Sequence, residues 1–181
     1  MAMTASRPAT EADLWATPDD AKYELVDGEI RRTPLASALH SCVNVSLMVR
    51  LGAFVEAHEL GRVLGANVGF RFPGGNVRCP DTTFTAAGRF DEKERPNDFV
   101  PVPPDLAVEI VWRGDRAREV LDKVGEYLDA GVRLVWVIDP ESRTATRYRS
   151  LNDVGALSAA DDLDGEDVLP GFRCRLAEIL E

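Results

Sequence analysis

The chain has 181 residues, 45% of them hydrophobic, and its 21 Lys and Arg against 31 Asp and Glu give a formal net charge of −10. This length suits one domain with a substantial core, and the composition is that of a folded chain. The acidic charge argues against tight, nonspecific nucleic-acid binding, which needs Lys and Arg beside phosphates. It does not exclude a metal-dependent enzyme, because carboxylates gathered around a divalent cation are themselves negative.

The sequence contains no apolar run that approaches the roughly 20 residues of a membrane-spanning helix, and residues 1–20 lack the apolar segment of a signal peptide. We therefore expect a single domain in the cytoplasm, with no membrane partner. Residues 1–20 are expected to be a short flexible lead-in, and residues 23–180 the folded body. Three widely spaced cysteines and two histidines predict neither a structural zinc site nor a disulfide framework.

The first predicted element is a β-hairpin at residues 23–34, because Asp27-Gly28 lies between short apolar strands. Residues 35–61 then predict a long helix, since apolar residues recur at steps of four, four and three. These apolar residues are Val43, Leu47, Leu51 and Phe54. Gly61 is predicted to cap the C-terminus of this helix.

The middle of the chain predicts strands and a second helix. Residues 62–88 form strands on either side of a turn at Pro73-Gly74-Gly75-Asn76. The polar, proline-rich residues 89–104 predict an exposed loop, and a strand follows at 105–112. Residues 114–132 predict a helix with an apolar inner face. That face consists of Ala117, Val120, Leu121, Val124 and Leu128.

The last third of the chain completes the predicted sheet. The apolar run at 133–139 is typical of a central strand, and 143–150 alternates in the manner of an edge or half-exposed strand. The acidic segment 159–167 predicts a solvated loop, and the tail is expected to dock on the body. The docking residues are Leu169, Phe172, Leu176 and Leu180.

The order of these elements defines the fold class. The strand–helix–strand unit from 105 to 139 implies a right-handed crossover and a mixed sheet. We therefore expect one α/β domain, or α+β with a mixed sheet, in which helices cover the sheet.

The strand at 105–112 carries two carboxylates. Asp105, Ala107 and Glu109 share one face, while the opposite face is fully apolar. A buried carboxylate requires a cation, a hydrogen bond or a proton. From this strand alone, Glu109 either pairs with an arginine or a loop amide, or it belongs to a functional site.

Two further residues favour a site. Asp81 follows Pro80 early in a preceding strand, and carboxylates on neighbouring strands form a hard-oxygen site for Mg²⁺ or Mn²⁺. Lys123, on the second helix, borders the apolar face, so its ammonium can reach the edge of the sheet. Alternatively, Lys123 pairs on the surface with Glu119 and Glu126, which lie one helical turn away on either side.

Five stretches of the chain resemble the Uma-two family of restriction endonucleases, within the PD-(D/E)XK nuclease superfamily. They are "YELVDGEI", "RCPDTTF", "PDLAVEIVW", "LDKVGEYLDAGVRLVWVIDP" and "LDGEDVLPGF", and they extend from Tyr23 to Phe172. The resemblance implies a PD-(D/E)XK restriction-endonuclease-like core of helix, three strands, helix and strand, preceded by an N-terminal β-hairpin.

The resemblance assigns roles to individual residues. Asp81 and Glu109 match the metal-binding acids of that superfamily, and the catalytic set is Asp81, Glu109 and Lys123. Lys123 matches a lysine displaced to the next helix, because Val111 occupies the usual lysine position.

Two further positions match the family pattern. Glu24 matches an acid in the leading hairpin, and His40 matches a polar position at the start of the first long helix. Both also have plainer interpretations, in which Glu24 pairs with an arginine and His40 caps the helix or packs.

The implied activity is hydrolysis of DNA phosphodiester bonds by a Mg²⁺- or Mn²⁺-dependent endonuclease. A homodimer is expected, and Arg78 and Arg113 are candidates for contacting the nucleic acid. The alternative is a catalytically inactive dimeric module on the same fold, with a binding or regulatory role. Trp112-Arg113-Gly114 replaces the family's serine-proline-serine stretch, and a bulky tryptophan there narrows or fills the site. A less favoured alternative is an enzyme that uses the same acids on a small molecule.

Overall fold

The structure is a computed structural model that describes residues 7–18, 20–90, 98–112 and 114–181. Its helices are α1 (Glu11–Trp15), α2 (Ala38–Ala57), α3 (Ala117–Asp129) and α4 (Leu176–Ile179), with a 3₁₀ turn η1 at Pro73–Gly75. The strands are β1 (Lys22–Val26), β2 (Glu29–Thr33), β3 (Gly61–Gly65), β4 (Phe70–Arg71), β5 (Val77–Arg78), β6 (Thr82–Ala86), β7 (Leu106–Ile110), β8 (Leu134–Asp139), β9 (Thr144–Ser150), β10 (Asp153–Ser158), β11 (Asp162–Asp164) and β12 (Arg173–Arg175).

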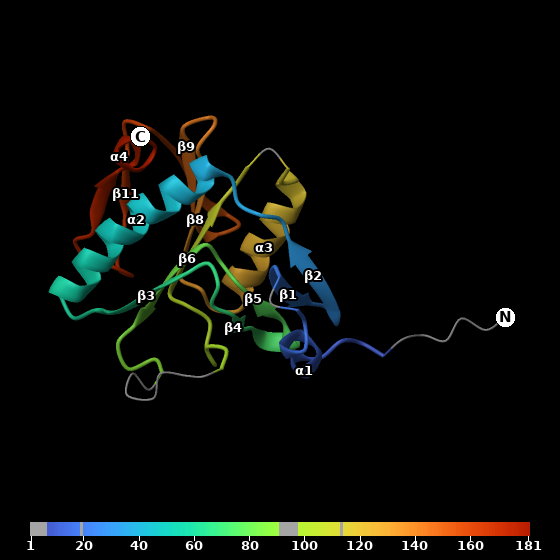
Figure 1. Cartoon of the computed structure of the whole chain (residues 1–181). Helices are drawn as coiled ribbons and strands as arrows, with labels where there is room; N and C mark the ends of the chain where they lie inside the picture. Colours follow the sequence, from blue (N-terminus) through green and yellow to red (C-terminus); the bar gives the residue numbers. More distant parts are fainter. Residues whose placement is uncertain (1–6, 19, 91–97, 113) are drawn as a thin grey trace.

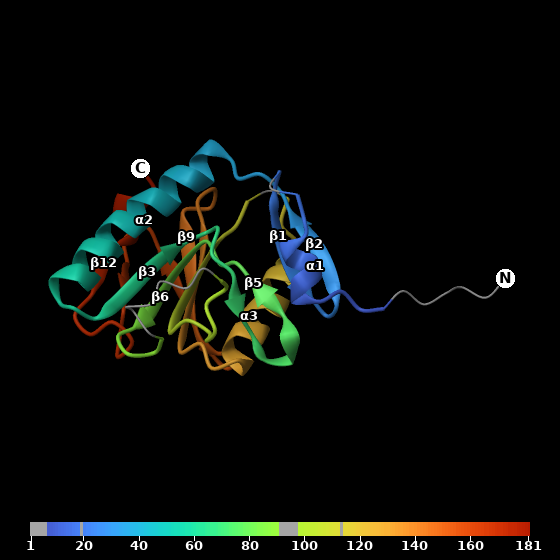
Figure 2. The same cartoon turned by 60° about the horizontal axis from the view of Figure 1, so that its bottom comes forward.

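A mixed sheet of order β10-β9-β8-β7-β6-β3 forms the centre of the domain. β7 and β8 are parallel and are connected through α3, while the other neighbouring strands are antiparallel. α2 lies on one side of this sheet and α3 on the other (Figures 1 and 2). The expected α+β fold with a mixed sheet and covering helices is confirmed.

Two smaller sheets flank the central one. β2-β1-β5-β4 form one sheet, and β11 pairs with β12 near the C-terminus (Figure 1). The hairpin β1–β2 turns at Asp27 and Gly28, with φ of 53° and 75°. Two successive positive φ values are those of a type I′ turn, so the hairpin predicted from Asp-Gly is confirmed.

β7 separates two hydrophobic clusters. Leu106, Val108 and Ile110 pack in the cluster that contains α2 and the C-terminal tail. Ala107 packs in the opposite cluster, which contains Val124 of α3. This alternation agrees with the two faces predicted for the strand, and it fixes the backbone of β7 from both sides.

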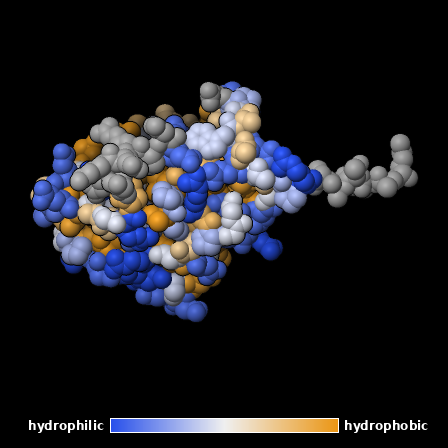
Figure 3. Space-filling view, turned by 90° about the horizontal axis from the view of Figure 1, so that it is seen from below, coloured by the Kyte–Doolittle hydropathy of each residue, from blue (hydrophilic) through white to orange (hydrophobic). Residues whose placement is uncertain are grey.

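The C-terminal tail docks on the α2 side of the sheet as predicted. Its buried residues belong to the same cluster as α2, and they are Leu169, Phe172, Leu176 and Leu180. Seen from below, hydrophilic and hydrophobic residues are interspersed over the surface (Figure 3).

α2 is apolar almost all round. Val43, Leu47, Leu51 and Val55 are buried against the sheet. By length and composition alone α2 is apolar enough to cross a membrane, with a mean hydropathy of 1.4, which departs from the expectation that the chain has no such run. The core helix of a water-soluble protein passes the same test.

The predicted cap of α2 at Gly61 is wrong. The helix ends at Ala57, and Glu59 adopts the left-handed conformation with φ of 54°. The amide of Leu60 donates to the carbonyl of Val55 at 3.0 Å, which is a Schellman closure. Gly61 is required by β3 instead, because a Cβ there would lie 2.1 Å from the Thr85 carbonyl oxygen.

Other elements also differ from the sequence-based expectation. Of the two alternatives for residues 143–150, the half-exposed strand is correct and the edge strand is wrong: β9 lies inside the sheet, because the unpredicted β10 pairs with its outer edge. The segment 159–167, expected to be a loop, contains β11. Leu121 of α3 is 48% exposed and not on the inner face. Within the expected lead-in, α1 buries Leu14 against the hairpin.

Candidate functional site

A pocket of about 280 Å³ opens where the start of β1, the start of α2, the junction of β6 with β7, and α3 meet. Its charged lining residues are Lys22, His40, Asp81, Glu109, Asp115 and Lys123. The pocket therefore brings together four residues predicted as site residues, namely Asp81, Glu109, Lys123 and His40. Its basic and acidic side chains are balanced, although the chain as a whole is acidic.

The pairing of β6 with β7 brings the two acids together. Thr82 of β6 lies opposite Val108 of β7, so Asp81, immediately before β6, comes level with Glu109. The amide of Asp81 donates to the carbonyl of Val108 at 3.0 Å, which continues the pairing by one residue. Sequence reasoning expected two adjacent strands to bring these acids together, and they do.

The Asp81 carboxylate is held through one oxygen. Oδ2 accepts a hydrogen bond from the Ile110 amide at 2.9 Å and lies 3.0 Å from His40 Nε2. Burial raises the pKa of Asp81, but the hydrogen bond with His40 and the charge of Lys22 outweigh burial and lower it. The carboxylate is therefore ionised at neutral pH.

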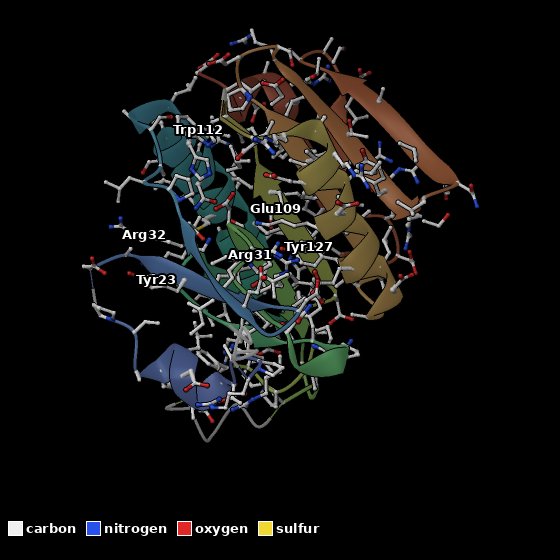
Figure 4. All side chains as sticks on the ribbon, turned by 90° about the vertical axis from the view of Figure 1, so that its right-hand side faces the viewer. Tyr23, Arg31, Arg32, Glu109, Trp112 and Tyr127 are labelled. Carbon is white, nitrogen blue, oxygen red and sulfur yellow. The ribbon has the colours of Figure 1, made fainter. Side chains whose placement is uncertain are left out.

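Glu109 projects from β7 toward α3, where Figure 4 shows it beside Tyr127. The Tyr127 hydroxyl donates to Oε1 at 2.5 Å, and Lys123 Nζ lies 3.3 Å from Oε2. Only 12% of the Glu109 side chain is exposed. Burial raises the pKa of Glu109, the negative charge of Asp81 adds to this effect, and Lys123 opposes it.

Lys123 faces into the site. Besides Glu109, its ammonium lies 3.8 Å from Glu24 Oε2. Burial lowers the pKa of Lys123, but the charges of Glu109 and Glu24 outweigh burial and raise it, so the ammonium stays charged. The alternative surface partners pair elsewhere, Glu119 with Arg116 and Glu126 with Arg78.

Glu24 forms a buried ion pair behind Lys123. Its Oε2 lies 3.2 Å from Arg78 Nη1, and its Oε1 accepts a hydrogen bond from the Cys79 amide at 2.9 Å. Arg78 is buried and also pairs with Glu126. A guanidinium enclosed by two carboxylates does not fit the expected contact with nucleic acid, so Arg78 is a structural partner of Glu24. Arg113, the other predicted contact, lies outside the described residues.

His40 lies in the first turn of α2. Its amide donates to the side chain of Ser37, the N-cap residue, at 3.2 Å. Its ring is directed at Asp81, and this hydrogen bond raises the pKa of His40 against the opposing effect of burial. His40 is therefore part of the acid cluster and does not serve as the cap.

Sequence reasoning missed two residues of the site. Lys22 begins β1, and its Nζ lies 3.8 Å from Asp81 Oδ1. The sequence clue to Lys22 was its position two residues before Glu24, which puts both side chains on the same face of the strand. Tyr127 lies one helical turn after Lys123, so helical spacing indicates that the two side chains are neighbours. The sequence gives no sign that the Tyr127 hydroxyl contacts Glu109.

Trp112 lines the pocket and is 41% exposed. A Cβ at Gly114 would lie 2.6 Å from the Trp112 ring, so the glycine lets the ring fold over that turn. The ring narrows the entrance but leaves the pocket open.

Asp105, the other acid of the strand, does not belong to the pocket. It pairs with Arg89 at 2.8 Å and accepts a hydrogen bond from the Ala86 amide at 2.8 Å. It therefore ties β7 to the end of β6.

Among the described residues, no group of three or more His, Cys, Asp or Glu side chains is arranged to hold a metal ion. Asp81 and Glu109 supply two carboxylates, each with one oxygen facing a lysine. Mg²⁺ characteristically binds through one or two carboxylates and completes its coordination with water and substrate phosphate. The donor set fits such an ion and does not fit a structural metal held by protein ligands alone.

The mixed sheet lies between helices, and two acids at the junction of β6 and β7 meet a lysine of α3; this is a protein of nuclease-like fold. The chain matches the model of the Uma2 family, described as "Putative restriction endonuclease", over residues 9–177. The chain belongs to this family.

A solved structure gives the same result for the fold. The chain is similar to the crystal structure of a "putative nuclease belonging to DUF820" from Anabaena variabilis ATCC 29413, with a TM-score of 0.83 and 18% sequence identity. The similarity covers 96% of this chain and 98% of the other. No curated protein matches the chain.

Proposed function

We propose that this protein is a Mg²⁺- or Mn²⁺-dependent endonuclease that hydrolyses phosphodiester bonds of DNA. The observation that carries the proposal is the meeting of Asp81, Glu109 and Lys123 in one open pocket. Membership of the Uma2 family and the nuclease-like fold support it.

Asp81 and Glu109 would hold the metal through the oxygens that face the lysines. The chemistry that such an ion would supply, when bound, is polarisation of the phosphate and a lower pKa for a coordinated water molecule. The protein orients the two carboxylates: His40 and the Ile110 amide fix Asp81, and Tyr127 fixes Glu109.

Lys123 contributes a positive charge beside the carboxylate of Glu109. It remains protonated beside Glu109, so it can stabilise negative charge that develops on the phosphate or orient the attacking water. Trp112 lines the same pocket, so its ring would limit how the DNA backbone approaches.

The test is plasmid cleavage with Mg²⁺ or Mn²⁺ by the natural protein, Glu109→Ala and Lys123→Ala. Loss of nicking in both variants, with thermal unfolding still cooperative, is the expected result. Glu119→Ala is the matched control, because this glutamate is exposed on α3, where it pairs with Arg116, and does not line the pocket. Unchanged cleavage by Glu109→Ala would contradict the assignment of Glu109 to the proposed nuclease centre.

A second function is favoured by one observation. Both acids already face lysines, as they would in a module that has kept the acids as structural residues. Such a catalytically inactive binding or regulatory module is distinguished by metal affinity. A competent site raises the unfolding temperature when Mn²⁺ is added, whereas an inactive module does not respond.

A homodimer and a cytoplasmic location complete the proposal. Two subunits suit the cutting of both DNA strands, and C2 dimers are the commonest oligomers. Light scattering coupled to gel filtration measures the mass in solution, and a monomeric mass at all concentrations would contradict the dimer. Fractionation of cells that express the protein tests the location.

A further inference from the structure

Lys22 is the lysine of the pocket lining to which the proposed function gives no role. Its ammonium lies 3.8 Å from Asp81 Oδ1, and only 17% of its side chain is exposed. Burying an ammonium costs free energy unless a counter-ion compensates. Its position therefore reflects a specific relation to Asp81.

The two acids of the site are held in place by hydrogen bonds. On Asp81, Oδ2 interacts with the Ile110 amide and with His40. On Glu109, Oε1 accepts the hydrogen bond of Tyr127, and Oε2 accepts one from Lys123 at 3.3 Å. The bonds of Asp81 set the orientation of that carboxylate through Oδ2 alone, so Oδ1 faces Lys22 without a hydrogen bond to it.

The second oxygen of each acid faces a lysine. Asp81 Oδ1 lies 3.8 Å from Lys22, and Glu109 Oε2 lies 3.3 Å from Lys123. The two lysines come from different elements, β1 and α3. They neutralise the two oxygens that a divalent cation requires.

Lys22 has room to leave Asp81. A separation of 3.8 Å exceeds hydrogen-bonding length, so the attraction is coulombic and fixes no geometry. With Asn67, Lys22 lines both the pocket and a neighbouring cavity of about 210 Å³. Its flexible stem can thus move the ammonium without disturbing β1.

We propose that Lys22 is the counter-ion of Asp81 in the metal-free protein, gives way to a divalent cation, and then binds the phosphate of the DNA in the pocket. The second half rests on the proposed function. Lys22 is then a second cation of the reaction centre, supplied by the N-terminal hairpin opposite Lys123.

Lys22→Met tests this, because it keeps the apolar stem and removes the charge. The dissociation constant for Mn²⁺, measured by titration calorimetry, should fall roughly threefold to tenfold, since no ammonium competes for Asp81. Plasmid cleavage at saturating Mn²⁺ should fall about tenfold or more. Loss of a purely structural lysine would not strengthen Mn²⁺ binding and weaken cleavage at the same time.

Two variants accompany this one. Lys22→Arg retains a cation, so it should restore Mn²⁺ affinity and cleavage to values near those of the natural protein. It is also the variant to measure if Lys22→Met does not fold. Arg32→Met removes an exposed charge from the same hairpin (Figure 4), with the same change in net charge. This variant should alter neither the Mn²⁺ affinity nor the cleavage.

The outcomes separate the two proposals. Mn²⁺ affinity that is unchanged or weaker in Lys22→Met overturns the counter-ion role, as does a natural protein that binds no Mn²⁺. Tighter Mn²⁺ binding with unchanged cleavage overturns the contact with phosphate alone. If the natural protein binds Mn²⁺ but cuts no DNA, the proposed function fails, and tighter binding by Lys22→Met still supports the counter-ion role.

Discussion

At the scale of single residues, the hydrogen bond from Tyr127 to Glu109 should be measurable. Tyr127→Phe leaves a buried carboxylate oxygen without its donor, so the free energy of unfolding should fall by about 1–2 kcal/mol and Mn²⁺ binding should weaken. Urea denaturation and calorimetry provide the two measurements. Tyr23→Phe is the control, since its hydroxyl bonds the exposed Asp20; an equal loss there would contradict the role of Tyr127.

Glu24 should make stability depend on pH. Burial raises its pKa, but Lys123, the Cys79 amide and Arg78 outweigh burial, so the folded value lies below the ordinary 4.5. The unfolded chain therefore takes up the proton more readily, and the stabilisation is complete above pH 4.5 and is lost as pH falls through the folded pKa.

Glu24→Gln removes this dependence. At pH 7 it should lower the free energy of unfolding by about 3 kcal/mol, because it leaves buried cations without a partner. Denaturation curves at several pH values should show a smaller loss on acidification than in the natural protein. Glu29→Gln, on the exposed side of the same hairpin, should behave like the natural protein, and a similar pH profile for both variants would contradict the prediction.

The sequence predicted the identity of the site residues better than their partners. Glu109 was predicted because an acid in an apolar strand is costly and therefore conspicuous. Asp81 was predicted from its place at the start of a preceding strand, and Lys123 from the family resemblance. Lys22 was missed because a lysine at the start of a strand is ordinary. Its role depends on Asp81, which is distant in sequence and becomes a neighbour only when β1 and β5 pair.

At the scale of elements, α2 has two faces of similar composition and different energetics. Leu47 is fully buried in the core, whereas Val49 is 64% exposed. Leu47→Ala should therefore lower the free energy of unfolding by about 2–5 kcal/mol, and Val49→Ala by less than about 0.5 kcal/mol. Chemical denaturation of the two variants checks this, and similar losses would mean that the outer face is also covered.

Elements with strong periodicity were predicted, and elements defined by their neighbours were not. The helices α2 and α3 and the strand β8 follow from local patterns. The alternation at 143–150 left an edge strand and a half-exposed strand open, and β9 is half-exposed but not at the edge, because β10 pairs along its whole length. No local signal distinguishes a half-exposed inner strand from an edge strand.

At the scale of the whole molecule, the net charge would limit how the proposed DNA substrate is held. With the excess of acids, the phosphates have few cations to meet beyond the pocket lysines. The logarithm of the apparent affinity, taken from KM between 50 and 200 mM KCl, should fall with the logarithm of salt concentration with a slope of about −2, as for two phosphate contacts. A slope steeper than about −5 would reveal an additional cationic surface.

The amide of Ile110, which donates to Asp81, makes the site visible to magnetic resonance. Its proton is hydrogen-bonded to a charged carboxylate and held in the buried backbone of β7, so its signal should lie downfield and exchange slowly with solvent. Mg²⁺ at Asp81 should shift this resonance, and paramagnetic Mn²⁺ should broaden it before most others. One assigned backbone signal can thus report occupancy of the centre without any substrate.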